Sequence, residues 1–249
     1  MESIASTNPR SPTPDRNGIA VLRVADIGPS VRAQMLSLLR GSYDNVSAEQ
    51  FETDLQEKEW AIVGSSRTQV LVFSTLRRIH IELNGRPITA FYSGDTVADP
   101  SIRGHETYAL IQYSLRTMFR EMLRDVDRAE YYWFMISSTY KSYRLLSQLF
   151  LDYAPSPWRE PASIESDTMA ALCEAKDLSF DPGRSIVTFA NPSIPRLRAG
   201  NSDDPSARFF GKRNPGAARG ERLASLVRLD AGNLTPLGRR LVFAGGNGG

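Results

Sequence analysis

The pattern of apolar and polar positions over residues 70–124 predicts a β-hairpin followed by a long helix. Two β-rich runs, residues 70–83 and 86–97, flank Asn84-Gly85. Asn and Gly both tolerate the positive φ that a type I′ turn requires, so this pair is a strong hairpin signal. From residue 106 to residue 124, apolar side chains recur every three or four residues, which is the spacing of one helix face. The start of such a helix presents backbone N–H groups that bind anions well.

The rest of the chain has the same two periodicities, interrupted by loops. Ser47 has the sequence position of a helix N-cap, and Ser163 is a second candidate cap. Residues 207–220 contain several helix breakers and predict a structured loop, in which Phe209-Phe210 forms a lid, a partner surface or, as we favour, a wrap around the sheet edge. We expect strands over residues 19–24, 59–63, 130–136, 184–189 and 223–229, and helices over residues 29–39, 47–56, 142–151 and 164–176.

This order of elements predicts an α/β protein with a mixed sheet, because antiparallel hairpins stand beside a crossover helix. Residues 1–18 are rich in Ser, Pro, Asn and Thr and predict a disordered arm. We expect the main domain over residues 19–160 and a C-terminal extension packed on it over residues 161–242. Residues 243–249 are expected to form a flexible tail.

Charge and cysteine content exclude several classes of function. The net charge is +2, and no dense block of Lys and Arg is present, which argues against a nucleic-acid partner. The single cysteine, Cys173, fits a reducing compartment. Neither a signal peptide nor a run of about 20 apolar residues is present, so we expect no membrane association and a cytoplasmic protein. Two histidines build no His-rich metal site, so we expect no metal.

The hairpin and the loop after it resemble the GNAT superfamily of acyl-CoA-dependent N-acyltransferases. In that family a hairpin ends in a bulged strand, and a pyrophosphate-binding loop with the pattern R/Q-x-x-G-x-G/A opens the next helix. Residues 96–104, TVADPSIRG, are similar to the run before that loop. The segments EYYWFMI and SYRLLSQLF are similar to the next strand and helix of the family. The resemblance covers residues 60–150 and implies a mixed, mostly antiparallel central sheet flanked by helices.

The resemblance also implies a function, the transfer of an acyl group from a thioester to an amine of a small-molecule acceptor. Glu106 and Tyr108 stand where the family loop has small residues, and a carboxylate there repels a diphosphate. Two donors therefore stay open, acyl-CoA and an acyl-carrier protein. One alternative is a binding or regulatory protein of this fold without catalytic activity. The other is a protein of the same fold that performs different chemistry on a small metabolite. Both a monomer and a homodimer fit the sequence.

Acyl transfer needs a base for the amine and an acid for the leaving thiolate. The resemblance implies that Ser93-Gly94-Asp95 marks the strand bulge and that Asp95 lies beside the donor carbonyl; the alternative is a turn residue. His80 and Glu82 alternate on one strand face, either toward a cleft or toward solvent. Tyr143 is a candidate acid or a packed aromatic.

Candidates for binding the donor gather at two helix starts. Arg103, Gly104 and His105 lie in the loop that corresponds to the family's anion-binding loop, and Arg103 is the best single candidate. Lys141 and Arg144 flank Tyr143 and would hold an anionic donor arm or a substrate carboxylate. The alternative for both is a solvated charge at a helix end.

Overall fold

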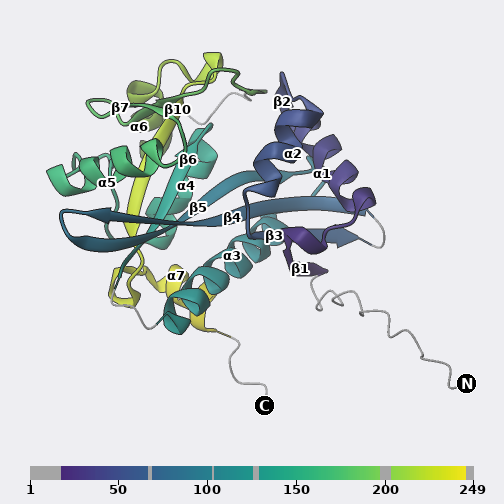
Figure 1. Ribbon diagram of the computed structural model, residues 1–249, viewed down its shortest axis with the longest axis horizontal. Helices are drawn as coiled ribbons and strands as arrows, with labels where there is room; N and C mark the ends of the chain where they lie inside the picture. The colour runs from purple at the N-terminus through teal and green to yellow at the C-terminus, as the bar shows by residue number, and fades with distance from the viewer. Residues whose placement is uncertain (1–17, 67–68, 103, 126–128, 197–202, 245–249) are drawn as a thin grey trace, which may run out of the picture.

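The computed structural model describes residues 18–66, 69–102, 104–125, 129–196 and 203–244 (Figure 1). Within these residues, an eight-stranded mixed sheet forms the centre of the molecule. Its strand order is β1 (Ile19–Arg23), β3 (Trp60–Ser66), β4 (Gln69–Leu83), β5 (Arg86–Ala98), β6 (Glu130–Ser137), β10 (Arg222–Arg228), β8 (Ile186–Thr188) and β7 (Ser179–Asp181). β5 and β6 run parallel, and the other neighbouring pairs of this sheet are antiparallel. The predicted fold class, a mostly antiparallel sheet flanked by helices, is confirmed.

Helices cover both faces of this sheet (Figure 1). One face packs against α3 (Gly104–Arg124), α4 (Tyr140–Leu149) and α7 (Pro236–Phe243), and the other against α1 (Pro29–Ser42), α2 (Ala48–Gln56) and α5 (Ser163–Glu174). α6 (Pro205–Arg213) lies against α4. The remaining short elements are β2 (Tyr43–Asp44), which pairs with β9 (Ile194–Pro195), and the 3₁₀ turns η1 (Val24–Asp26), η2 (Ala217–Arg219) and η3 (Ala231–Asn233).

The hairpin of β4 and β5 forms as its turn sequence predicts. Asn84 and Gly85 have φ values of 53° and 73°, the left-handed conformation of a type I′ turn. The pairing begins at Leu83 and Arg86, directly beside the turn. From β5 the chain crosses over through α3 to the parallel strand β6, and this connection places the long amphipathic helix on one face of the sheet.

A bulge in β5 changes which face its side chains point to. β4 advances two residues from Ser74 to Leu76, while their partners on β5 advance three residues, from Ser93 to Thr96. The extra residue reverses the alternation of side chains after this point. Phe91 accordingly joins the core below α3, whereas Val97, six residues later, joins the core below α1 and α2. The bulge lies within the segment 93–95 where the sequence predicts it.

The C-terminal third departs from the sequence predictions. Residues 207–220 were expected to be a loop, but α6 begins at Pro205, where the Asp204 side chain accepts a hydrogen bond from the Ser206 backbone N–H. Phe210 is buried in the core, so the predicted lid, partner surface or wrap around the sheet edge is wrong. The N-cap of α5 is Ala162, and Ser163 is the first helical residue.

Strand β10 joins the sheet between β6 and β8. The sheet therefore continues across residue 160, the predicted boundary between the main domain and its extension. The predicted arm over residues 1–18 lies outside the described residues except for Gly18, and most of the predicted tail lies outside them as well.

Candidate active site

The parallel strands β5 and β6 separate at their C-terminal ends. Their pairing runs from Ile88 and Glu130 to Ser93 and Met135, and both strands then continue without pairing to each other, β5 as far as Ala98. The separation begins at the bulge, so among the described residues the β6-facing edge of β5 has no strand partner beyond Ser93. An opening thus forms in the middle of the sheet.

Two cavities lie at this opening, one on each face of the sheet. A cavity of about 60 Å³ lies on the side of α3 and α4, and its lining includes Ser114 and Ser142. A cavity of about 240 Å³ lies on the side of α1 and α2, and its lining includes Phe51 and Asp54. The residues that line both cavities are Tyr92, Asp95 and Arg222.

Asp95 lies at the bulge, between the two cavities. Burial raises the pKa of its carboxyl from 3.8 to about 6, and the nearby Asp54 carboxylate adds to this rise. Arg222 and Lys58 oppose the rise but do not cancel it. A carboxyl group with this pKa is largely ionised at neutral pH and can still accept a proton readily, which suits a general base.

Gly94 allows the bulge to approach Thr75 of β4 and Lys58, which follows α2, closely. A Cβ atom at this position would overlap the Thr75 hydroxyl and lie 2.7 Å from Cε of Lys58. The Lys58 side chain is fully buried, and its Nζ lies 2.6 Å from Oδ1 of Asp54. This close contact fixes the backbone beside Asp95 against a rigid neighbour.

Hydroxyl groups surround the smaller cavity. The Tyr43 hydroxyl lies 2.8 Å from Oγ of Ser138, and both residues line the cavity. Burial raises the pKa of Tyr43, so its hydroxyl stays protonated and can donate a hydrogen bond. The hydroxyl of Ser93 accepts a hydrogen bond from Nε1 of Trp133 at 2.9 Å, which fixes the last paired residue of β5.

The ring of Tyr92 contacts two lysines. Nζ of Lys176 lies 4.4 Å from the ring centroid, and Nζ of Lys58 lies 5.4 Å from it. Burial raises the pKa of the Tyr92 hydroxyl and lowers the pKa of Lys176. Cations over an aromatic face are attracted to its negative charge distribution, so this arrangement stiffens the wall that Tyr92 contributes to both cavities.

The other predicted catalytic residues do not lie with Asp95. His80 and Glu82 are exposed near the hairpin turn, and His80 contacts the hydroxyl of its cross-strand partner Thr89 at 3.0 Å. Thr89 precedes Asp95 by six residues, which in a strand corresponds to about 20 Å. The structure therefore supports the solvent-facing alternative for this pair.

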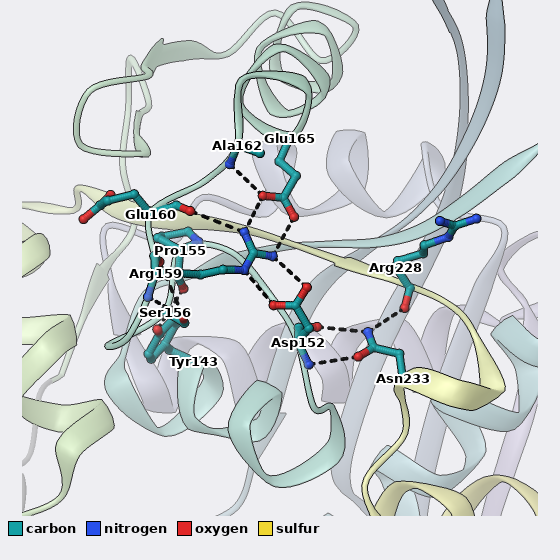
Figure 2. A network of polar contacts seen from close by, with 10 residues as sticks. All are labelled: Tyr143, Asp152, Pro155, Ser156, Arg159, Glu160, Ala162, Glu165, Arg228 and Asn233. Carbon is teal, nitrogen blue, oxygen red and sulfur yellow. Dashed lines mark hydrogen bonds and ion pairs between the residues drawn. The ribbon is translucent and has the colours of Figure 1, made fainter.

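Tyr143 is a packed aromatic residue. Its side chain is fully buried, and its hydroxyl donates a hydrogen bond of 2.9 Å to the carbonyl oxygen of Pro155. Figure 2 shows this loop held by Arg159, which bridges the carboxylates of Asp152 and Glu165. Burial raises the pKa of Tyr143 far above its ordinary range. Tyr143 lines neither cavity, so this position does not bring its hydroxyl to a leaving thiolate.

The structure does not place the predicted donor-binding residues together at the opening. Arg103 lies outside the described residues. Gly104 and His105 begin α3, and the His105 side chain also lies outside the described part. Lys141 is exposed on α4. Arg144 forms an ion pair with Asp204, in which Nε lies 3.1 Å from Oδ2. Neither Lys141 nor Arg144 lines a cavity at the opening.

Three residues of the site were missed by the sequence reasoning. The apolar periodicity of α2 places Asp54 on the polar face of the helix, where an exposed side chain is expected. Tyr43 lies just after α1 in a segment without a recognisable motif. Arg222 begins a strand whose partners, β6 and β8, are distant in sequence. No local signal distinguishes these three residues, because only the tertiary arrangement brings them to the opening.

The described residues contain no group of three or more His, Cys, Asp or Glu side chains arranged to hold a metal ion. Among the helices of the described part, none combines the length and apolar character needed to cross a bilayer.

The topology now allows a comparison with known proteins. The β4–β5 hairpin, the bulge, the crossover helix α3, the parallel strand β6 and the helix α4 follow one another in the order that the sequence resemblance implies. The chain has a GNAT-like fold. No protein-family model matches the chain, and no curated protein matches it significantly.

Three solved structures that resemble this chain are described as N-acyltransferases or N-acetyltransferases. A probable N-acyltransferase from Enterococcus faecalis aligns with 55% of this chain and 32% of its own, at 15% identity and a TM-score of 0.41. The aminoglycoside 6'-N-acetyltransferase from Enterococcus faecium aligns with 55% of this chain and 87% of its own, at 12% identity and a TM-score of 0.40. A GNAT family N-acetyltransferase from Escherichia coli in complex with CoA aligns with 96% of this chain and 89% of its own, at 12% identity and a TM-score of 0.38.

Proposed function

We propose that this protein is an acyltransferase that moves an acyl group from a thioester donor to the amine of a small-molecule acceptor. One observation carries the proposal: Asp95, with a pKa raised to about 6, lies at the opening between β5 and β6 and lines a cavity on each face of the sheet. A group in this position contacts both reactants if each occupies one cavity. Holding two reactants on either side of a base converts a reaction between free molecules into one within a single complex.

The chemical step needs one base and two hydrogen-bond donors. The neutral acceptor amine lies in the larger cavity, and its nitrogen attacks the thioester carbonyl carbon. As the C–N bond forms, the nitrogen gives one proton to the Asp95 carboxylate, which later releases it to solvent, and the C–S bond breaks. The thiolate that leaves takes up one proton through the hydroxyl pair of Tyr43 and Ser138, which solvent then replenishes.

The donor enters from the side of α3 and α4. The unpaired edge of β5 beyond Ser93 offers backbone hydrogen-bonding groups to a donor arm that carries amides, as a strand edge does to an added strand. The smaller cavity of about 60 Å³ has room for only a few water molecules, which favours a short acyl group. Our candidates for binding the anionic part of acyl-CoA or of a carrier-protein arm are Gly104 and His105 at the start of α3, the preceding residue Arg103, and the cations Lys141 and Arg144.

Donor binding and amine-dependent release of thiol test this function together. We expect acetyl-CoA or an acetylated acyl-carrier protein to raise the melting temperature and to release free thiol when a mixture of amines is added. Asp95→Asn should keep donor binding and lose thiol release by about 100-fold or more, the range that general bases contribute. Asp167→Asn is the matched control, since Asp167 is an exposed carboxylate on α5 that lines neither cavity.

Two results would contradict the proposed function. Absence of any melting shift with both donors would favour a binding or regulatory protein of this fold that has no transfer activity. Thiol release by Asp95→Asn at the rate of the unmodified protein would remove Asp95 from the reaction.

A further inference from the structure

Arg222 is an arginine whose charge the described residues leave unmatched. It is the first residue of β10, and its side chain lines both cavities at the opening. Its Nη2 donates a hydrogen bond of 2.6 Å to Oγ of Ser193, and its guanidinium carbon lies 4.5 Å from the centroid of the Phe189 ring. Its Nε is buried and has no hydrogen-bond partner in the described part of the chain.

Three other partly buried arginines of this protein are paired with carboxylates. Arg32 contacts Glu52 at 2.9 Å, Arg78 contacts Glu59 at 2.8 Å, and Arg159 contacts Glu165 at 2.6 Å. Arg222 forms no such ion pair with any described carboxylate, although the Asp95 carboxylate is near enough to feel its charge. Removing a cation from water without supplying an anion is costly, so an anion from outside the chain would stabilise this arrangement.

The larger cavity is lined by side chains of both negative and positive charge. Asp95 and Asp54 give one part of its wall a negative field, and Arg222 gives another part a positive one. Leu39, Phe51 and Phe189 supply apolar lining between and around them. The cavity volume of about 240 Å³ is below the roughly 300–1,000 Å³ of sites for drug-sized ligands, so the occupant is a small metabolite.

We propose that the acceptor is an amine that also carries an anionic group, a carboxylate or a phosphate, and that Arg222 binds this group. The guanidinium is held from one side by Ser193 and stacked on Phe189, so its remaining N–H groups present a planar fork of the kind that binds both oxygens of a carboxylate or phosphate. The amine then lies on the side of Asp95. The assignment of this ligand as an acceptor rests on the proposed function, whereas its binding does not.

Calorimetric titration without any donor tests this proposal, using pairs of amines that differ only in the anionic group. To test binding of a carboxylate, each common α-amino acid is compared with the amine that its decarboxylation gives. To test binding of a phosphate, phosphoethanolamine is compared with ethanolamine. We expect the anionic member of at least one pair to bind about tenfold or more tightly than its neutral partner, since charge-assisted bidentate contacts are strong.

Substitutions assign the preference to Arg222. Arg222→Gln should bring both members of the pair to equal affinity, and Arg222→Lys should restore part of the difference because it keeps the charge without the fork. Arg228→Gln should leave the preference unchanged, since Arg228 is exposed at the other end of β10 and lines neither cavity. Melting curves of each variant report whether it is folded, and Arg222→Lys serves as the test if Arg222→Gln does not fold.

The outcomes separate this inference from the proposed function. Equal binding of both members in every pair, binding of no anionic member at millimolar concentration, or a preference that survives Arg222→Gln would overturn the inference. Acyl transfer to neutral amines without such a preference would leave the proposed function standing alone. Selective binding of an anionic amine without transfer from either donor would keep the inference and contradict the proposed function.

Discussion

A carboxylate that is ionised in a partly buried position lowers the stability of the fold that holds it. The pKa of Asp95 rises from 3.8 in the unfolded chain to about 6 in the folded protein. Between these values the folded state keeps a proton that the unfolded state releases, so stability falls as the pH rises through this window and stays low above it. The rise corresponds to about 3 kcal/mol at most. A protein retains such a cost at a position where the charge is used.

Replacing Asp95 by Asn should therefore stabilise the protein at neutral pH. We expect the free energy of unfolding of Asp95→Asn to increase by about 1–3 kcal/mol, because the neutral amide avoids the cost of an ionised group. Close to pH 3.8, where the carboxyl of the folded protein is protonated, the gain should vanish. Urea unfolding at the two pH values measures the difference. A variant that is less stable than the parent at neutral pH would show that Asp95 is a structural residue.

At the scale of elements, local sequence determines much of this fold. Local residue types and their spacing are enough to predict the Asn84-Gly85 turn, the Ser47 N-cap and the apolar face of α3. None of these features depends on tertiary contacts. Two C-terminal helices escaped the sequence reading although each begins with a cap followed by proline, Asp204-Pro205 and Thr235-Pro236. Proline ends a helix in its interior but fits its first turn, so these pairs begin helices.

The bulge in β5 is the local element on which the site depends. Gly94 contacts Lys58 and Thr75 so closely that a Cβ cannot be added without a shift of the backbone or of the buried lysine. We expect Gly94→Ala to lower the free energy of unfolding by about 1–3 kcal/mol, the cost of overpacking, and to reduce acyl transfer by displacing Asp95.

The matched control for Gly94 is Gly41→Ala. Gly41 lies in α1, and nothing lies within 4 Å of a Cβ at that position, so alanine should stabilise the helix by about 0.5–1 kcal/mol. Thermal melting and the thiol-release assay measure both variants. If Gly94→Ala retained both stability and activity, the close approach at the bulge would not matter to the site.

At the scale of the whole molecule, the order of strands decides which residues meet. β10 enters the sheet beside β6, about 85 residues after it in the chain, and this non-local pairing brings Arg222 to the opening beside Asp95. Periodicity predicts that residues 223–229 favour a strand, but it contains no information on which strand they pair with. For this reason the sequence could single out Asp95 as a candidate, whereas it could not single out Arg222 and Tyr43.

The position of β10 also predicts that the main domain does not fold without the C-terminal third. A chain that ends at residue 160 would leave β6 as an unpaired edge and expose the core that Leu223, Leu226 and Val227 cover. We expect this fragment to show no cooperative urea transition, while the full chain unfolds in one transition. A fragment with a cooperative transition and dispersed amide resonances would support an independent domain over residues 19–160.

The pH dependence of amine-dependent thiol release tests the central claim most directly. If Asp95 is the base, kcat/KM should rise with pH on a limb whose midpoint lies near 6, because only the ionised carboxylate accepts the proton. Asp95→Asn should lose this limb along with the activity, and Asp167→Asn should keep both. A limb that persists with the same midpoint in Asp95→Asn would contradict the account, because another group would then carry the titration.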